Sequence, residues 1–200
     1  MKKLNKALLL TGVILSTNAN SALINYYRDA NYSHQVDLRN TSFPTYKNTI
    51  NYNDQLSSIS IEPGNGCVLM AKDHTFKGDW LFTDSSIANL HSFGFNDVIS
   101  SWVAFDTTTG CNEGNIAVLF YDANGGGGKF PAVPNSYNSD MGYFNDEASS
   151  IYIPYGITVT LFEHSAGGGE YVILTGKGTI YNLENYRFND KVSSFNVTKS

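Results

Sequence analysis

The chain has 200 residues, of which 16% are charged and 14% are aromatic, with 18 glycines and a formal net charge of −5. Many aromatics and few charges exclude a disordered chain. The negative net charge disfavours electrostatic binding to nucleic-acid phosphates. Glycine combined with Tyr, Phe and Val, and with only five prolines, indicates short strands joined by tight turns. We therefore expect an all-β protein of one or two domains.

Residues 1–22 have the features of a secretory signal peptide. Three lysines precede an apolar stretch of nine residues, 7–15, and small residues follow at 19–22. The apolar stretch is less than half of the roughly 20 residues that a membrane-spanning helix needs. We therefore expect a secreted or periplasmic protein without a membrane span. Loss of the three lysines leaves 10 basic and 18 acidic residues, a net charge of −8, which favours cations as partners.

After this segment, one hexapeptide occurs four times. Asn-Asp-x-x-Ser-Ser lies at 53–58, 96–101, 145–150 and 189–194, at spacings of 43, 49 and 44 residues. Composition alone predicts about 0.01 occurrences. An alternating apolar stretch follows each copy, at 59–61, 102–105, 151–153 and 195–197, and predicts a strand there.

A polar, often glycine-rich turn lies 20–25 residues before each hexapeptide. These turns span 27–32, 71–78, 121–128 and 162–169, with a strand before each and a short strand after it. Each unit therefore consists of roughly four antiparallel strands, with at most a short helical turn in the connections. A unit of about 40 residues is too small to bury its apolar face alone, so we expect the units to pair.

The spacing of the repeats predicts how the units pair. The second gap is the longest because it contains a polar, Thr- and Gly-rich stretch, 106–115. We therefore expect units one and two to form a domain at 23–106 and units three and four a domain at 115–200, with a linker at 107–114.

Cys67 and Cys111 are the two cysteines of the chain. An even count in an exported protein favours a disulfide. The alternatives are a catalytic thiol or a metal ligand. No histidine lies at ligand spacing from them, which disfavours zinc.

The hexapeptide and the turn before it resemble the signature of the βγ-crystallin superfamily, in particular of its microbial calcium-binding members. That signature joins an aromatic-x4-aromatic-x-Gly hairpin to the hexapeptide. The hairpin element departs from it here: unit one has His34 in the glycine place, unit two has Ala71 in place of the first aromatic, and units three and four have Gly126 and Gly167 where the second aromatic belongs. The resemblance covers residues 23–200 and implies two Greek-key β-sandwich domains.

The residue types of the hexapeptide indicate a hard cation. Asn, Asp and Ser supply oxygen ligands, which calcium prefers, and neither a thiolate nor an imidazole that would favour zinc or copper. The alternative is a purely structural turn, because Asn and Asp bond their own backbone and tolerate left-handed conformations. We assign the last serine of each copy, Ser58, Ser101, Ser150 and Ser194, to that structural role.

By resemblance, up to four calcium ions lie between the hexapeptide of one unit and the hairpin of its partner. In the first domain, the implied ligands of one site are Asn53, Asp54, Gln55 and Ser57 with the loop at Lys72 and Asp73; those of the other are Asn96, Asp97, Val98 and Ser100 with the loop at Arg28 and Asp29. In the second domain they are Asn145, Asp146, Glu147 and Ser149 with Glu163, and Asn189, Asp190, Lys191 and Ser193 with Asp122.

The sequence contains no pattern that predicts catalysis. Its four histidines and its carboxylates form neither a nucleophile–base nor a paired-acid motif. We therefore expect an exported, non-catalytic, calcium-binding protein in which the ion stabilises the fold, with a surface, matrix or stress-related role. The alternative is a secreted protease inhibitor or toxin-like protein on the same fold. The sequence identifies no protein or glycan partner.

Overall fold

The computed structural model describes residues 24–39, 45–48, 52–63, 66–105, 111–134, 137–138 and 141–199. The predicted signal peptide and residues 107–110 of the predicted linker lie outside these ranges. The described part is all-β, as predicted, with 3₁₀ helices of three or four residues in the connections. Within it, no helix combines the length and the hydrophobicity that crossing a bilayer requires.

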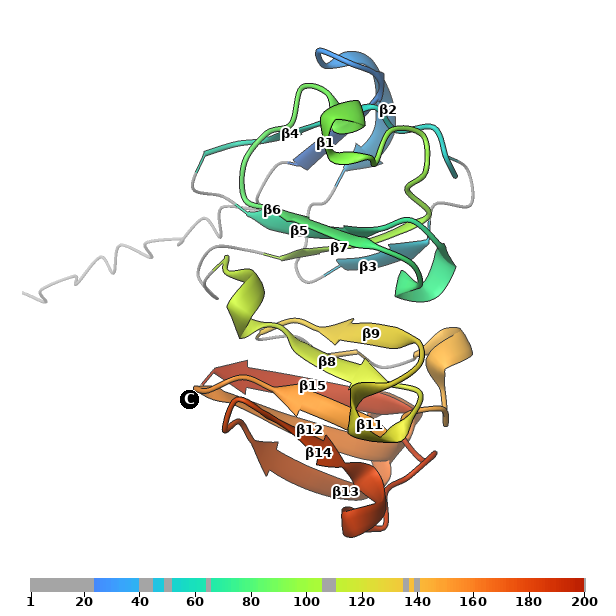
Figure 1. Ribbon diagram of the computed structural model, residues 1–200, viewed down its shortest axis with the longest axis vertical. Coiled ribbons are helices and arrows are strands. Elements are labelled where there is room, and N and C mark those ends of the chain that lie inside the picture. Colours follow the sequence, from blue (N-terminus) through green and yellow to red (C-terminus); the bar gives the residue numbers. More distant parts are fainter. Residues whose placement is uncertain are drawn as a thin grey trace, which may run out of the picture.

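The strands up to residue 105 form two antiparallel sheets (Figure 1). Sheet A has the order β2-β1-β4, and sheet B has the order β3-β7-β5-β6. The strands are β1 (Ile24–Asp29), β2 (Ser33–Arg39), β3 (Thr45–Asn48), β4 (Ser58–Ile61), β5 (Cys67–Ala71), β6 (Trp80–Thr83) and β7 (Ser101–Phe105). The short helices are η1 (His74–Phe76) and η2 (Leu90–Phe93).

The strands from residue 117 onward form two further antiparallel sheets. Sheet C has the order β14-β11-β8-β9, and sheet D has the order β10-β15-β12-β13. The strands are β8 (Ala117–Phe120), β9 (Lys129–Ala132), β10 (Tyr137–Asn138), β11 (Ser150–Ile153), β12 (Ile157–His164), β13 (Gly168–Thr175), β14 (Thr179–Asn182) and β15 (Ser194–Lys199). The short helices are η4 (Glu113–Asn115), η5 (Ala123–Gly125), η6 (Gly142–Phe144), η7 (Ser165–Gly167) and η8 (Leu183–Tyr186).

Three of the four units send a strand into the sheet of the partner unit. β3 of unit one pairs with β7 of unit two, β10 of unit three pairs with β15 of unit four, and β14 of unit four pairs with β11 of unit three. In sheet A the same relation is reduced to one bridge, between Ile59 and Ile87. This exchange gives the Greek-key connection. It also explains why a unit of this size does not stand alone: part of each sheet belongs to the other unit.

The four hairpins share one backbone conformation. Three residues in each have positive φ at the same spacing: Asn31, Tyr32 and His34; Thr75, Phe76 and Gly78; Asn124, Gly125 and Gly127; Ala166, Gly167 and Gly169. The place of the second aromatic in unit three is therefore taken by Gly125, and the prediction of Gly126 is wrong by one residue. Four successive glycines, 125–128, leave that register undetermined in the sequence.

Sheet B is buried on both faces. Its inner face, including Val68 and Trp102, packs on sheet A in the core of the first sandwich. Its outer face, including Leu69 and Val103, belongs to a second cluster that continues through Phe130 into the core of the other sandwich. The rings of Phe76 and Phe130 meet edge to face with centroids 5.2 Å apart. The two sandwiches, stacked along the long axis of the molecule, therefore share a buried apolar junction (Figure 1).

Sheet D has the strand order of sheet B but presents a polar outer face. Matching strand pairs place Thr160 and Asn196 where sheet B has Leu69 and Val103. Leu69 and Val103 are fully buried, whereas Thr160 and Asn196 are partly exposed. The side chains therefore follow the surroundings: apolar where the second sandwich covers the sheet, and polar where solvent does.

Cys67 and Cys111 form a disulfide, as predicted, with their Cα atoms 5.7 Å apart. Cys67 begins β5 and is fully buried, and Cys111 is the first described residue after the gap at 106–110. The bond therefore ties the start of the second half of the chain to the central strand pair of sheet B.

Candidate cation sites

The second residue of each hexapeptide adopts a left-handed backbone conformation. Its φ is 54° at Asp54, 51° at Asp97, 57° at Asp146 and 53° at Asp190. Asp is one of the few non-glycine residues enriched in this region, since its short polar side chain bonds locally. The preceding Asn donates from Nδ2 to the Asp Oδ2 at 2.6–2.7 Å in all four copies. The repeated Asn-Asp pair therefore sets the orientation of one carboxylate per motif.

The two hexapeptides of a domain are joined by reciprocal backbone hydrogen bonds. The Asp54 N–H donates to the Ile99 carbonyl at 3.3 Å, and the Asp97 N–H donates to the Leu56 carbonyl at 3.0 Å. In the other domain, the N–H groups of Asp146 and Asp190 donate to the carbonyls of Val192 and Ala148, each at 3.0 Å. Each domain therefore contains a pair of interlocked loops with approximate twofold symmetry.

The fifth residue of each hexapeptide bonds the Asp of the other hexapeptide. In all four cases a serine hydroxyl donates to an Asp Oδ1 at 3.1 Å; the pairs are Ser57–Asp97, Ser100–Asp54, Ser149–Asp190 and Ser193–Asp146. Every candidate site therefore draws oxygen atoms from both units of its domain.

The same serine also contacts the hairpin of its own unit. Its N–H donates at 2.9–3.0 Å to a carbonyl at the start of the hairpin, which belongs to Tyr27, Ala71, Phe120 or Phe162. In the last motif the Ser193 hydroxyl also donates to the Glu163 carbonyl at 2.7 Å. An aspartate of one motif, a serine of the other and a hairpin carbonyl are thus brought together.

The sixth residue has the structural role that we predicted. The hydroxyls of Ser58, Ser101, Ser150 and Ser194, all fully buried, donate to a hairpin carbonyl at 2.6–2.7 Å and accept from a hairpin N–H at 3.0 Å. The acceptor carbonyls belong to Asp29, Asp73, Asp122 and His164. Each serine thereby satisfies two buried backbone groups that a left-handed turn leaves unpaired.

The structure divides the predicted ligands of the first domain between its two sites. Asp54 lines a cavity of about 380 Å³ with Lys72 and Asp73, the hairpin with which it was predicted to lie. Ser57, however, contacts Asp97 and the hairpin of its own unit, which contains Arg28 and Asp29. Ser100 takes the place beside Asp54 instead. The predicted residues therefore assemble with their fifth-position serines exchanged.

The second domain has the same arrangement. Asp146 lies with Ser193, which contacts the Glu163 carbonyl. Asp190 lies with Ser149, whose neighbour Ser150 contacts the Asp122 carbonyl. The predicted association of each Asp with the hairpin of the partner unit is thus present, and again the serines are exchanged.

The third residue of each hexapeptide differs in its surroundings. Val98 lines the cavity beside Asp54, and Gln55 is exposed. Lys191 extends toward the Glu163 carboxylate, with Nζ and Oε1 3.4 Å apart, and Glu147 lies near the Tyr121 phenol. Burial, with a smaller contribution from Glu147, raises the pKa of that phenol.

Two carboxylates beside the hairpins are held in their charged form. The Glu170 N–H donates to Glu163 Oε2 at 3.2 Å and, with the weaker effect of Lys191, lowers the pKa of the Glu163 carboxyl. A hydrogen bond from Lys72 Nζ, 2.9 Å from Oδ2, lowers the pKa of the Asp79 carboxyl. Negative charge is therefore retained at the rim of both loop pairs at neutral pH.

Tyr121 is a hairpin residue of a candidate site that was not predicted from the sequence. Phe120 is the structural counterpart of Tyr27, Ala71 and Phe162, so the counterpart of Glu163 in unit three is Tyr121 rather than Asp122. By the same register, Arg28 and Lys72 are its counterparts in units one and two. The end of β8 at Phe120 determines this register, and the glycine run that follows carries no signal for it.

The assembled donors fit a hard cation better than a soft one. Each place offers carboxylate, hydroxyl and backbone carbonyl oxygens, and these are calcium ligands. The described residues include no group of three or more His, Cys, Asp or Glu side chains arranged to hold a metal. The sites therefore depend on mixed oxygen donors, with one motif carboxylate each.

The exchanged strands and the interlocked Asn-Asp-x-x-Ser-Ser loops define a class of fold. It consists of two Greek-key sandwiches, and in each sandwich two hexapeptide loops bond to one another. No family model and no curated protein matches the chain significantly. The chain is similar to several solved structures, including a βγ-crystallin domain, a βγ-crystallin and a clostrillin mutant. The domain, from Flavobacterium johnsoniae, is 25% identical (42% of this chain and 94% of that one covered, TM-score 0.37), and the archaeal βγ-crystallin is 26% identical (40% and 94%, TM-score 0.35). A clostrillin double mutant solved in complex with nickel is 23% identical (42% of this chain and 98% of that one covered, TM-score 0.37).

Each of these likenesses covers about two-fifths of the chain, and the TM-scores are low. The description of the fold rests on the molecule itself, namely the strand exchange and the hexapeptide in all four units. On these features the chain consists of two Greek-key β-sandwiches and resembles the βγ-crystallin superfamily.

Proposed function

We propose that this is an exported, non-catalytic calcium-binding protein with up to four ions per chain. The observation that carries the proposal is the fourfold Asp–Ser pairing across interlocked loops, at 3.1 Å in every copy. A purely structural turn needs the buried sixth serine but does not need an aspartate and a serine from two different units to converge. The convergence of oxygen donors from both units is what a cation between them requires.

Calcium, when bound, would neutralise the motif carboxylates and cross-link the two units of a domain. The carboxylates of Asp54, Asp97, Asp146 and Asp190 and the serine hydroxyls opposite them would hold it, with hairpin carbonyls at the positions of Arg28, Lys72, Tyr121 and Glu163. The serine proton now donated to Asp Oδ1 would turn away so that the hydroxyl oxygen faces the ion. Few carboxylates per site favour micromolar to millimolar affinity.

The predicted signal peptide and the disulfide support export to an oxidising compartment. There, a ligand that binds only the folded chain adds to its stability. We propose that calcium makes the protein robust as a surface or matrix component or under stress.

Calorimetric titration of the mature, EDTA-treated protein with calcium tests the proposal. We expect saturable heat with a stoichiometry of up to four, and a melting temperature that rises with calcium concentration. Magnesium at equal concentration is the control for ionic strength and charge. Absence of both heat and thermal shift at millimolar calcium would exclude the proposed function.

A further inference from the structure

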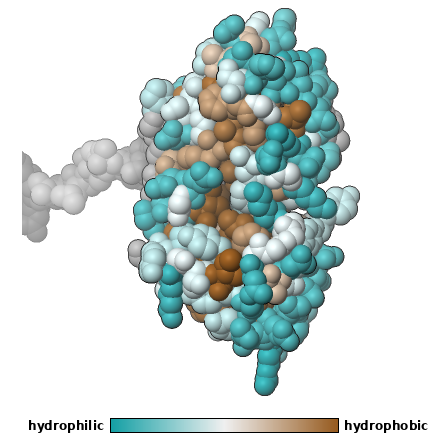
Figure 2. Space-filling view, in the orientation of Figure 1, coloured by the Kyte–Doolittle hydropathy of each residue, from teal (hydrophilic) through white to brown (hydrophobic). Residues whose placement is uncertain are grey.

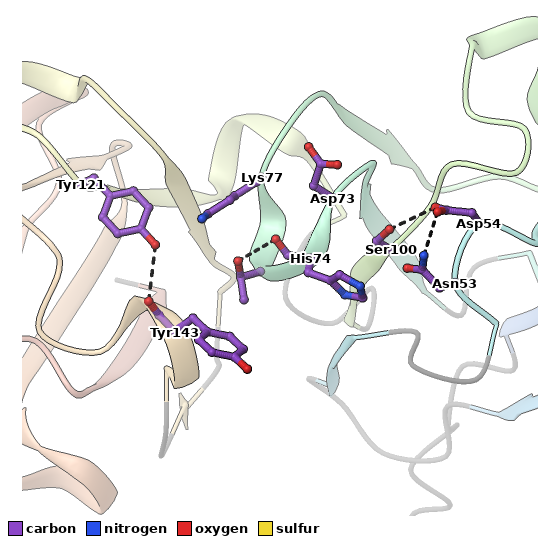
Figure 3. Close-up of a pocket in the computed structure, with 9 residues that line it drawn as sticks. Asn53, Asp54, Asp73, His74, Lys77, Ser100, Tyr121 and Tyr143 are labelled. Atoms are coloured by element: carbon purple, nitrogen blue, oxygen red, sulfur yellow. Dashed lines mark hydrogen bonds between the residues drawn. The ribbon is translucent and has the colours of Figure 1, made fainter.

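A groove between the two sandwiches lies beside the Asp54–Ser100 pair and has a volume of about 600 Å³ (Figure 3). One end is formed by Tyr121 and Tyr143 of the second domain, and the other by Asn53, Asp54 and Ser100 of the first. Asp73, His74 and Lys77 of the β5–β6 hairpin lie between the two ends (Figure 3). The volume is within the usual range for ligand pockets.

The aromatic end of the groove is built on a fixed support. The Tyr121 ring packs on Phe144 with centroids 4.4 Å apart, and its hydroxyl donates to the Tyr143 carbonyl at 3.4 Å. Lys77 Nζ lies 5.7 Å from the centroid of the same ring. Phe144 is buried, whereas the adjacent Tyr143 is 81% exposed. The turn thus anchors one ring in the core and presents the next one to solvent at the mouth of the groove.

The remaining lining is polar and nearly balanced in charge. Asp54 and Asp73 carry negative charge and Lys77 carries positive charge, while His74 and Asn53 add hydrogen-bond donors and acceptors. Two carboxylates disfavour a phosphate or another polyanion, and the polar half disfavours an apolar ligand. The groove is open to solvent rather than closed over. On the face of the molecule drawn in Figure 2, hydrophobic surface lies next to polar surface along the junction of the sandwiches.

We propose that this groove binds an uncharged glycan. A sugar ring has an apolar face that stacks on an exposed aromatic ring and a rim of hydroxyls that both donate and accept hydrogen bonds. Tyr143 supplies the stacking surface, and His74, Asn53 and Asp73 supply partners for hydroxyls. The extended open shape suits a segment of a polysaccharide chain. The groove shares Asp54 and Ser100 with a proposed calcium site, but stacking on Tyr143 does not require an ion.

Native affinity electrophoresis tests it with the mature protein. Its net charge of −8, after loss of the three lysines, lets it migrate in a neutral gel without added carrier charge. The probes are hydroxyethyl cellulose, xylan, mannan and glycogen, each cast into a gel, with dextran sulfate as the polyanion. We expect at least one uncharged polysaccharide to retard the protein, and dextran sulfate to retard it no more than the reference protein albumin.

Three variants locate the binding. Tyr143→Ala should weaken retardation about tenfold, whereas Tyr143→Phe, which keeps the ring, should stay within about twofold of the wild type. Tyr155→Ala removes another tyrosine of similar exposure, 76%, that lies outside the groove, and should not change retardation. The melting temperature of each variant checks folding.

Retardation by none of the uncharged polysaccharides, retardation by dextran sulfate alone, or equal retardation of wild type and Tyr143→Ala would each overturn the proposal. Calcium titration of Tyr143→Ala keeps the two functions apart. If Tyr143→Ala binds calcium like the wild type but is no longer retarded by the polysaccharide, the glycan proposal is supported. If the wild type does not bind calcium, only the proposed calcium function is contradicted.

Discussion

Ser57 and Asp97 lie 40 residues apart in the sequence, and the Ser57 hydroxyl donates to Asp97 Oδ1 at 3.1 Å. The reciprocal pair, Ser100 and Asp54, has the same distance. Each motif therefore supplies the carboxylate of one site and the hydroxyl of the other. A substitution in one hexapeptide can damage either site, depending on the position that is changed.

The crossed arrangement predicts which pairs of substitutions act on the same calcium ion. Asp54→Ala and Ser100→Arg should each remove one ion from the stoichiometry, and the double variant should remove no more than that one. Asp54→Ala combined with Asp97→Ala should remove two, because these residues belong to different sites. Calorimetric stoichiometry measures the difference.

Ser57→Arg with Ser100→Arg should abolish both sites of the first domain and leave those of the second. If Ser100→Arg and Asp97→Ala behaved as members of one site, the crossed assignment would be wrong.

Because the outer face of sheet B is covered, we expect a polar residue there to lower the free energy of unfolding strongly. Val103→Asn places an amide in the buried junction between the sandwiches, and it should lower the free energy of unfolding by about 2–4 kcal/mol. The reverse change at the equivalent position of sheet D, Asn196→Val, should change it by less than about 1 kcal/mol because that face is partly exposed. Urea unfolding measures both. Similar effects of the two changes would mean that the sandwiches do not cover sheet B in solution.

The Cys67–Cys111 disulfide closes a loop with a sequence separation of 44 residues. In the chain-entropy model a loop of this length contributes on the order of 4 kcal/mol. Cys67→Ala with Cys111→Ala should therefore lower the midpoint of urea unfolding markedly, and a reductant should do the same to the wild type. The double variant should show no response to the reductant, and a response there would point to another cause.

The hydrogen bond from the Glu170 N–H gives Glu163 a pH-dependent role. Because the pKa of Glu163 is lowered from 4.5 in the folded chain, its carboxylate stabilises the fold above the unfolded pKa. That contribution is lost as the pH falls through the lower, folded pKa. Glu163→Gln should therefore have a lower melting temperature than the wild type at about pH 7, and the difference should shrink at about pH 3.

The measurement is made in EDTA so that calcium does not contribute. Glu184→Gln, at an exposed position in η8, is the matched control. A constant difference between wild type and Glu163→Gln across this range would show that the carboxylate charge is not responsible.

The fourfold hexapeptide was sufficient to predict the fold class and the position of every strand that follows it. β4, β7, β11 and β15 all begin at or directly after a motif. The role of the sixth serines was also predictable, because a small hydroxyl before a strand is well suited to bind a turn. The register of the third hairpin was not predictable, since four glycines in succession fit the turn in more than one way.

By itself, the sequence determined the repeat, the all-β class and the oxygen-rich chemistry of the motifs, because these depend on residue types and spacing along the chain. It favoured the disulfide, which the tertiary structure contains. The tertiary structure decided which serine joins which aspartate, and which face of which sheet is covered. Both depend on the exchange of strands between units: the interlocked loops meet across a pseudo-twofold axis, so partners are set by the packing of two units rather than by their separation in sequence. The same packing brings Tyr143 opposite the first domain and creates a groove that neither half of the chain contains alone.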